Sequence, residues 1–225
     1  HMLFVDGGNN SIGINNSTPG SYDGGADDLV VGDHSVSSQG ITIASDDNSI
    51  IYFADGTSGD EAYRGSIIYN HPADNFIFRT GGFNARMTIA SNGEISTGGE
   101  AAPDVTPGGI CLNQAASDQA ILTFKSSDVA HGITDNAETD TYAVFKKNDA
   151  NSGGLDLFTF SERTDGEYFR IIAHGNGLSS TKSTSGIGAM HFVTLIKSGT
   201  GAGSISSNDN ILTISNGAST RFIFD

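Results

Sequence analysis

The chain has 225 residues, which fits one large β domain or two small ones, and its formal net charge is −15. Lys and Arg together number only 11, so the sequence excludes nucleic-acid binding through a basic surface and disfavours anionic membranes. No apolar run approaches the roughly 18 residues of a membrane helix, and no membrane insertion is expected. We interpret His1 and Met2 as a cloning remnant.

Glycine and short apolar groups indicate an all-β fold. The 30 glycines are about twice the usual share. Aliphatic and aromatic residues are separated by Gly, Asn, Asp and Ser, which is typical of short strands joined by tight turns. Helix signals are confined to Ala115–Gln119 and Asn136–Thr141, and neither has a sustained apolar stripe. In chain order, the predicted strands are Leu29–Val31, Gly40–Ile43, Ile50–Phe53, Ser66–Tyr69, Phe76–Phe78, Arg86–Ile89, Ile121–Phe124, Thr141–Phe145, Leu155–Phe160, Tyr168–Ala173, Ala189–Ile196, Ile211–Ile214 and Arg221–Phe224.

Strands of this length bury little apolar surface within one chain. We therefore expect a thin core that neighbouring chains complete. Cys111 is the only cysteine, so no disulfide can form within the chain. Its Gly-Ile-Cys-Leu context predicts a buried structural thiol rather than a nucleophile, because no activating neighbour is apparent.

An internal repeat is the most informative feature of the sequence. Residues 74–90 (DNFIFRTGGFNARMTIA) align without a gap with residues 209–225 (DNILTISNGASTRFIFD). Each copy reads as a short strand, a glycine-containing turn and a second short strand, which predicts a β-hairpin with positive φ at the glycine. The identical pairs are Asp74 and Asp209, Asn75 and Asn210, Gly82 and Gly217, and Arg86 and Arg221.

A weaker match relates residues 45–55 to residues 117–128, where an Asp-containing turn precedes an apolar strand. The two matches have different offsets, which predicts two related modules, the second with extra sequence. Strand–turn–strand patterns near both ends lead us to expect that the natural protein continues in both directions. The predicted organisation is a shaft-like repeat end at 1–20, a first β module at 21–99, a linker at 100–108, and a second related β module at 109–225 with an insertion at about 125–190.

Several of these segments resemble known motifs of virus fibres. Residues 3–20 (LFVDGGNNSIGINNSTPG) resemble the VGIGTxxP segments of phage tail fibre and tail spike proteins. Residues 85–99 (ARMTIASNGEISTGG) resemble the RMxIxxxGxVGIGT segment of the same proteins. Residues 52–82 and 108–135 resemble blocks of marine phage fibre-like proteins, and residues 145–205 are the least covered. The sequence departs from the pattern at Ile12–Asn15, where a second glycine is usual.

The resemblance implies hairpin repeats in β-sandwich-like or β-prism-like modules, intertwined as a parallel homotrimer. It implies a virion tail fibre segment that is assembled in the host cytoplasm, acts outside the cell and binds a host-surface glycan or protein. Three-fold closure would cover exposed strand edges and merge three thin cores. The resemblance brings no catalytic residue and no cofactor, so we expect a protein that is not an enzyme.

Two alternatives to a receptor-binding fibre stay open. The first is a polysaccharide depolymerase of the tail-spike type, a glycan hydrolase or lyase with an active site between chains. The second is a purely structural shaft segment without a ligand.

Aromatic and charged residues of the predicted insertion are the first candidates for a glycan site. Aromatic rings can stack on sugar rings, and Trp, the usual best platform, is absent. We therefore predict ligand binding by Tyr142, Glu162, Arg163, Asp165 and Tyr168.

Adjacent carboxylates supply an alternative candidate site. Neighbours on a strand point to opposite faces, so adjacency alone gives no paired geometry for glycoside hydrolysis. Asp27-Asp28, Asp46-Asp47 and Asp60-Glu61 all lie in polar turns, where solvated carboxylates are expected. No histidine spacing typical of a metal site occurs, so no metal site is predicted. The alternative cluster combines two acids, a phenol and a guanidinium: Asp60, Glu61, Tyr63 and Arg64.

Overall fold

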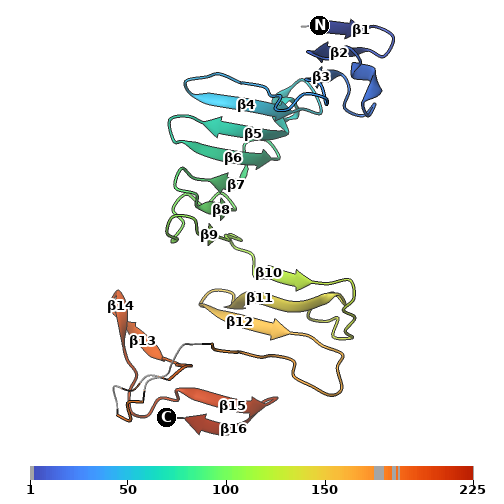
Figure 1. Cartoon of the computed structure of the whole chain (residues 1–225). Coiled ribbons are helices and arrows are strands. Elements are labelled where there is room, and N and C mark those ends of the chain that lie inside the picture. Colours follow the sequence, from blue (N-terminus) through green and yellow to red (C-terminus); the bar gives the residue numbers. More distant parts are fainter. Residues whose placement is uncertain (1–2, 175–179, 184–185, 187, 225) are drawn as a thin grey trace. The chain divides into compact units, whose positions relative to one another are not determined.

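The computed structural model describes residues 3–174, 180–183, 186 and 188–224, and it confirms the predicted all-β fold (Figure 1). The chain forms two compact units, residues 1–160 and residues 161–225. The helices of the described part are two short 3₁₀ turns, η1 (Pro19–Ser21) and η2 (Gly59–Tyr63). The predicted module boundaries at 20, 99 and 108 stay a prediction.

The first sheet of the N-terminal unit turns its apolar side chains outward. It contains β1 (Leu3–Asp6), β2 (Ser11–Ile14) and β3 (Leu29–Val31), with β2 antiparallel to β1 and parallel to β3. Along β2, Ser11 and Gly13 are buried, whereas Ile12 and Ile14 are exposed. This burial is the reverse of what a self-contained domain gives to such residues.

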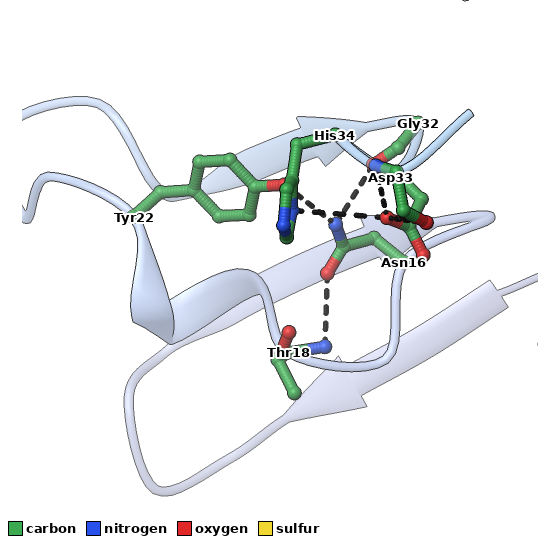
Figure 2. A network of polar contacts seen from close by, with 7 residues as sticks. Asn16, Thr18, Tyr22, Gly32, Asp33 and His34 are labelled. Atoms are coloured by element: carbon green, nitrogen blue, oxygen red, sulfur yellow. Dashed lines mark hydrogen bonds and ion pairs between the residues drawn. The ribbon is translucent and has the colours of Figure 1, made fainter. Parts of the chain in front are cut away.

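Asn16 fixes the long connection between β2 and β3 (Figure 2). Its buried side chain donates hydrogen bonds to the Gly32 carbonyl oxygen at 2.8 Å and to the Tyr22 hydroxyl at 3.2 Å. It also accepts a hydrogen bond from the Thr18 amide at 2.9 Å. Gly13 leaves room for this loop, because a Cβ at that position would lie 2.2 Å from the Asn16 carbonyl oxygen.

The second sheet of this unit has six strands in chain order. Neighbouring strands are antiparallel except for β8 and β9, which are parallel. The pairing of β8 with β9 brings together the two sides of the predicted linker at 100–108. The strands are β4 (Asn48–Phe53), β5 (Gly65–Asn70), β6 (Asn75–Thr80), β7 (Ala85–Ile89), β8 (Ile95–Thr97) and β9 (Ile110–Cys111).

This sheet is a single layer with two different faces. Among the described elements, its strands make substantial contacts only with their neighbours in the sheet and with η2. Residues paired across strands share a face, so the register defines each face. The polar face carries Asn48, Ile50, Tyr52, Ser66, Ile68, Asn70, Asn75, Ile77, Arg79, Thr88 and Ser96. The apolar face carries Ile51, Phe53, Ile67, Tyr69, Phe76, Phe78, Met87, Ile89, Ile95 and Ile110.

A third sheet ends the N-terminal unit and holds a small core. Its antiparallel strands are β10 (Ala120–Lys125), β11 (Thr141–Asp149) and β12 (Gly153–Thr159). Val144 and Phe160 are buried, and the Phe160 ring stacks on the buried His131 ring with centroids 4.7 Å apart. Val144, Phe160, Ile68 and Pro19 are the buried apolar side chains of the described residues.

The C-terminal unit consists of two hairpins without a core of their own. The first pairs β13 (Leu195–Ser198) with β14 (Gly201–Ser204), and the second pairs β15 (Leu212–Asn216) with β16 (Ser219–Phe224). No described residue of this unit is buried. A two-stranded hairpin alone is at best marginally stable in water, so this unit needs a covering surface.

The hairpin predicted for the repeat is confirmed in both copies. β6 pairs with β7 and β15 pairs with β16, both antiparallel. The turn glycines Gly82 and Gly217 have φ of +79° and +56°, the conformation that the repeat predicts for them. Each hairpin also has one register irregularity near its middle.

Two predicted strands, most of a third and both helix candidates are wrong. Gly40–Ile43 and Tyr168–Ala173 form no strand, and within Ala189–Ile196 only Leu195 and Ile196 do. An apolar run becomes a strand where a neighbouring segment completes its hydrogen bonds, and no described segment pairs with the first two. The helix candidates at 115–119 and 136–141 form turns and irregular backbone, except that Thr141 begins β11.

The accessible surface supports the expectation of a thin core. It measures 16680 Å², whereas a compact monomer of this mass exposes about 9,700 Å². Contact between two domains of one chain buries about 600–1,500 Å², much less than this excess. Most of the excess therefore belongs to surfaces that a compact monomer would bury.

Replacing Asn16 by Ala should loosen the β2–β3 connection. The substitution removes three hydrogen bonds at a buried position, a loss of about 1–3 kcal/mol. The Gly32 amide, which donates to the Ile14 carbonyl oxygen at 2.8 Å, should exchange with deuterium at least about fivefold faster. The control is Asn9→Ala, since Asn9 lies in an exposed turn and bonds Asp6. Equal exchange of the Gly32 amide in the two variants would contradict the role given to Asn16.

Candidate functional site

The first predicted cluster is only partly assembled. In residues 161–168, the Arg163 guanidinium donates to the Asp165 carbonyl oxygen at 2.8 Å. The Tyr168 hydroxyl donates to the Arg163 carbonyl oxygen at 2.8 Å. Gly166 permits this turn, because a Cβ there would lie 2.5 Å from the Arg163 guanidinium. Arg163, Asp165 and Tyr168 therefore form one local turn, and Glu162 lies in the same exposed segment.

Tyr142 belongs to the other unit, where it lies on β11. Its carbonyl oxygen accepts a hydrogen bond from the Phe160 amide at 3.1 Å, and its ring lies 6.0 Å from the Phe124 ring. Residues 162–168 belong to the C-terminal unit. Each unit thus holds its own part of the predicted set, and the prediction that these residues bind a glycan stays a prediction.

The alternative cluster is brought together by η2 and the loop that joins β4 to β5. The Tyr63 hydroxyl donates to the Asp60 carboxylate at 3.2 Å, and Arg64 pairs with Asp55 at 3.3 Å. The Glu61 carbonyl oxygen accepts the Asp55 amide at 2.9 Å, which closes the loop. Gly56 is required here, because a Cβ would lie 2.2 Å from the Glu61 carboxylate.

Two aromatic rings outside the predicted cluster extend it into a platform. The centroid of the Tyr63 ring lies 4.5 Å from that of Phe83 and 6.2 Å from that of Tyr52. Phe83 is 64% exposed and Tyr52 is 49% exposed, so both rings present surface to solvent. Sequence reasoning missed Phe83. Its signal was an aromatic residue in a Gly-Gly-Phe-Asn turn, where polar residues are usual.

The environment of Tyr63 keeps its phenol protonated. Desolvation raises the pKa of Tyr63, and the hydrogen bond and negative charge of Asp60 raise that pKa further. The phenol therefore remains a donor to Asp60 across the neutral range. Asp60 in turn keeps a lone pair available for a ligand hydroxyl, since an ionised carboxylate accepts several hydrogen bonds.

The described residues offer no metal site, and the comparisons with known proteins identify no relative of the chain. No group of three or more His, Cys, Asp or Glu side chains suited to a metal ion occurs in the described part of the chain. Within the same residues, no helix is long and apolar enough to cross a membrane. No protein-family model, curated protein or solved structure matches the chain.

Removing the Asp60 carboxylate should lower the pKa of Tyr63 toward its ordinary value. Both the hydrogen bond and the charge of Asp60 raise that pKa, so Asp60→Asn weakens both effects. The measurement is an NMR pH titration of the protein labelled at the tyrosine ring carbons. Asp55→Asn is the matched control, because Asp55 pairs with Arg64. A Tyr63 titration unchanged by Asp60→Asn would contradict the described geometry.

Proposed function

We propose that the chain is a segment of a virion tail fibre, in which three copies close their apolar sheet faces on one another and present a host-recognition surface outward. One observation carries the structural part of this proposal. No described helix or strand outside the six-stranded sheet packs on its apolar face.

The apolar face is too extensive for an ordinary exposed surface. Phe53 is 55% exposed, Ile51 is 47% exposed and Ile110 is 61% exposed. Gly65 opens a hollow of about 530 Å³ beside Phe53, Ile67 and Phe78. Contiguous apolar surface of this kind marks an interaction site in soluble proteins. Burial of each large side chain would contribute about 1.5–3 kcal/mol.

Similar surfaces recur along the chain. In the first sheet Ile12 and Ile14 point outward from β2. In the last hairpin Ile214 pairs with Phe222, and both are at least half exposed. A partner for a single pocket would leave these other faces uncovered. Further copies of the same chain carry the same exposed apolar faces, so each of these faces could be covered by its counterpart in another copy.

Closed three-fold symmetry would cover these apolar faces with copies of the same chain. Three single-layer sheets can form the sides of a prism with their apolar faces inward and their polar faces outward. Such closure merges three thin cores into one and gives each copy the same environment. It also brings three copies of any outward site together, which increases avidity without new contacts.

Recognition is favoured over hydrolysis at the aromatic platform. A glycosidase needs one acid and one base or nucleophile about 5–10 Å apart. Here Asp60 accepts the Tyr63 hydroxyl and Asp55 pairs with Arg64, so both carboxylates already have partners. New reducing ends released from a host-surface polysaccharide would instead favour the depolymerase alternative.

A charge placed on the apolar face should prevent assembly. Ile51→Glu puts a carboxylate on the apolar face, where association would bury it at a cost of several kcal/mol. Tyr52→Glu is the matched control, because the neighbouring residue has similar exposure and lies on the polar face. Sedimentation equilibrium should give three times 23.3 kDa for the wild type and the Tyr52 variant. It should give a smaller mass for Ile51→Glu, whereas equal masses for the two variants would contradict the proposal.

A further inference from the structure

Residues 1–124 contain three cationic side chains, Arg64, Arg79 and Arg86, against 15 Asp and Glu. All three lie at one end of the six-stranded sheet. Arg64 directly precedes β5, Arg79 lies near the end of β6 and Arg86 lies near the start of β7. Antiparallel pairing brings these strand ends together, since Arg79 is opposite Ala85. The only positive charges of this long acidic stretch are therefore concentrated in one place.

Two of these arginines have no carboxylate partner among the described residues. Arg64 pairs with Asp55, but no described ion pair involves Arg79 or Arg86. The Arg79 Nε atom is buried and makes no hydrogen bond within the described chain. A buried charged donor left without an acceptor is costly. The Arg86 Nε atom donates to the Thr80 hydroxyl at 3.1 Å, so Arg86 has a neutral partner but no carboxylate. In a chain this rich in carboxylates, two arginines at one sheet end without a carboxylate partner indicate an acidic acceptor supplied by a ligand.

The same sheet end carries an exposed aromatic ring. The Arg79 guanidinium lies 5.7 Å from the centre of the Phe83 ring, and the Tyr63 ring lies on Phe83 at 4.5 Å. The Gly82 backbone keeps the Asp60 carboxylate accessible, because a Cβ there would approach it to 3.3 Å. A flat ring suits the C–H face of a sugar, a carboxylate accepts its hydroxyl groups, and a guanidinium binds a carboxylate.

By register Arg79 belongs to the polar face, and at the sheet end Arg64 and Arg79 also border the hollow beside Phe53. Tyr52, Ser66 and Arg79 are in register on the polar face, whereas Phe53, Gly65 and Thr80 are in register on the apolar face. The aromatic platform continues from Tyr52 through Tyr63 to Phe83. A ligand on the Phe83 ring would therefore lie at the sheet end, on the polar side of the Arg79 register position.

We propose that this sheet end binds an acidic saccharide, with the sugar carboxylate at Arg79 and Arg86 and the sugar ring on Phe83. Asp60 accepts a hydroxyl group of the same sugar. This inference rests on the proposed recognition of host-surface glycans and narrows it to glycans that contain uronic-acid-like units. The overall negative charge of the chain disfavours binding of anions elsewhere on the surface, which makes the cationic end selective.

The test is calorimetric titration of the full chain with a galacturonate oligosaccharide at low salt. A galactose oligosaccharide of the same length and inorganic phosphate serve as comparison probes. We expect galacturonate to bind more tightly than either probe, and we expect its affinity to fall as salt is added. Equal binding of galactose, or phosphate binding as tight as galacturonate, would overturn the assignment to an acidic sugar.

Substitutions test which residues form the proposed saccharide site. Arg79→Gln and Phe83→Ala should each weaken galacturonate binding at least about tenfold, since each removes a main contact. Arg221→Gln is the matched control, because Arg221 occupies the repeat position equivalent to Arg86 in the other hairpin. Equal weakening by Arg221→Gln, or no galacturonate binding by the wild type, would overturn the site.

Failure of this inference can be separated from failure of the proposed function. The mass in solution is measured for each variant, and Arg79→Gln and Phe83→Ala should retain the wild-type mass because both residues lie off the apolar face. If the wild type is a trimer that does not bind galacturonate, only the acidic-sugar site is disproved. If the wild type is a monomer that binds galacturonate, the proposed assembly is disproved and the acidic-sugar site is supported.

Discussion

A single-layer β-sheet satisfies its backbone hydrogen bonds within the layer but leaves two faces of side chains to be covered. In this chain the strands β4 to β9 pair with one another, and no described helix or strand forms a second layer on the face that carries Ile51, Phe53 and Phe76. The free energy gained from backbone hydrogen bonds alone does not exceed the conformational entropy that the chain loses on folding. Covering this apolar face is therefore the constraint on which the stability of the chain and its proposed assembly depend.

The two faces of the six-stranded sheet have different roles in the proposed fibre. Alternation along each strand sends Ile51 and Phe53 to one side and Tyr52 to the other, so one short segment serves both assembly and recognition. By register Arg79 lies on the polar face, and its guanidinium contacts the Phe83 ring of the platform. A fibre built in this way keeps its ligand site exposed however tightly its copies associate.

Local features were predictable from the sequence, and features that depend on distant pairing were not. The repeat predicts two hairpins with positive φ at Gly82 and Gly217, because the turn chemistry lies within a few residues. The parallel pairing of β9 with β8 joins segments on either side of a glycine-rich stretch, and no local pattern indicates it. Of the candidate site, the sequence located Asp60, Tyr63 and Arg64. It missed Phe83 and Arg79, since only the register of β5 with β6 places them beside that cluster.

Hydroxyl-radical footprinting of the wild-type protein tests the central claim most directly. Phe53 and Phe83 are the same residue type, and in the single chain they are 55% and 64% exposed. Phe53 lies on the apolar face, whereas Phe83 belongs to the aromatic platform. The account predicts that Phe83 is oxidised readily while Phe53 is protected at native concentration. Similar oxidation of the two rings would show that the apolar face is open to water, and it would contradict the claim that other copies cover it.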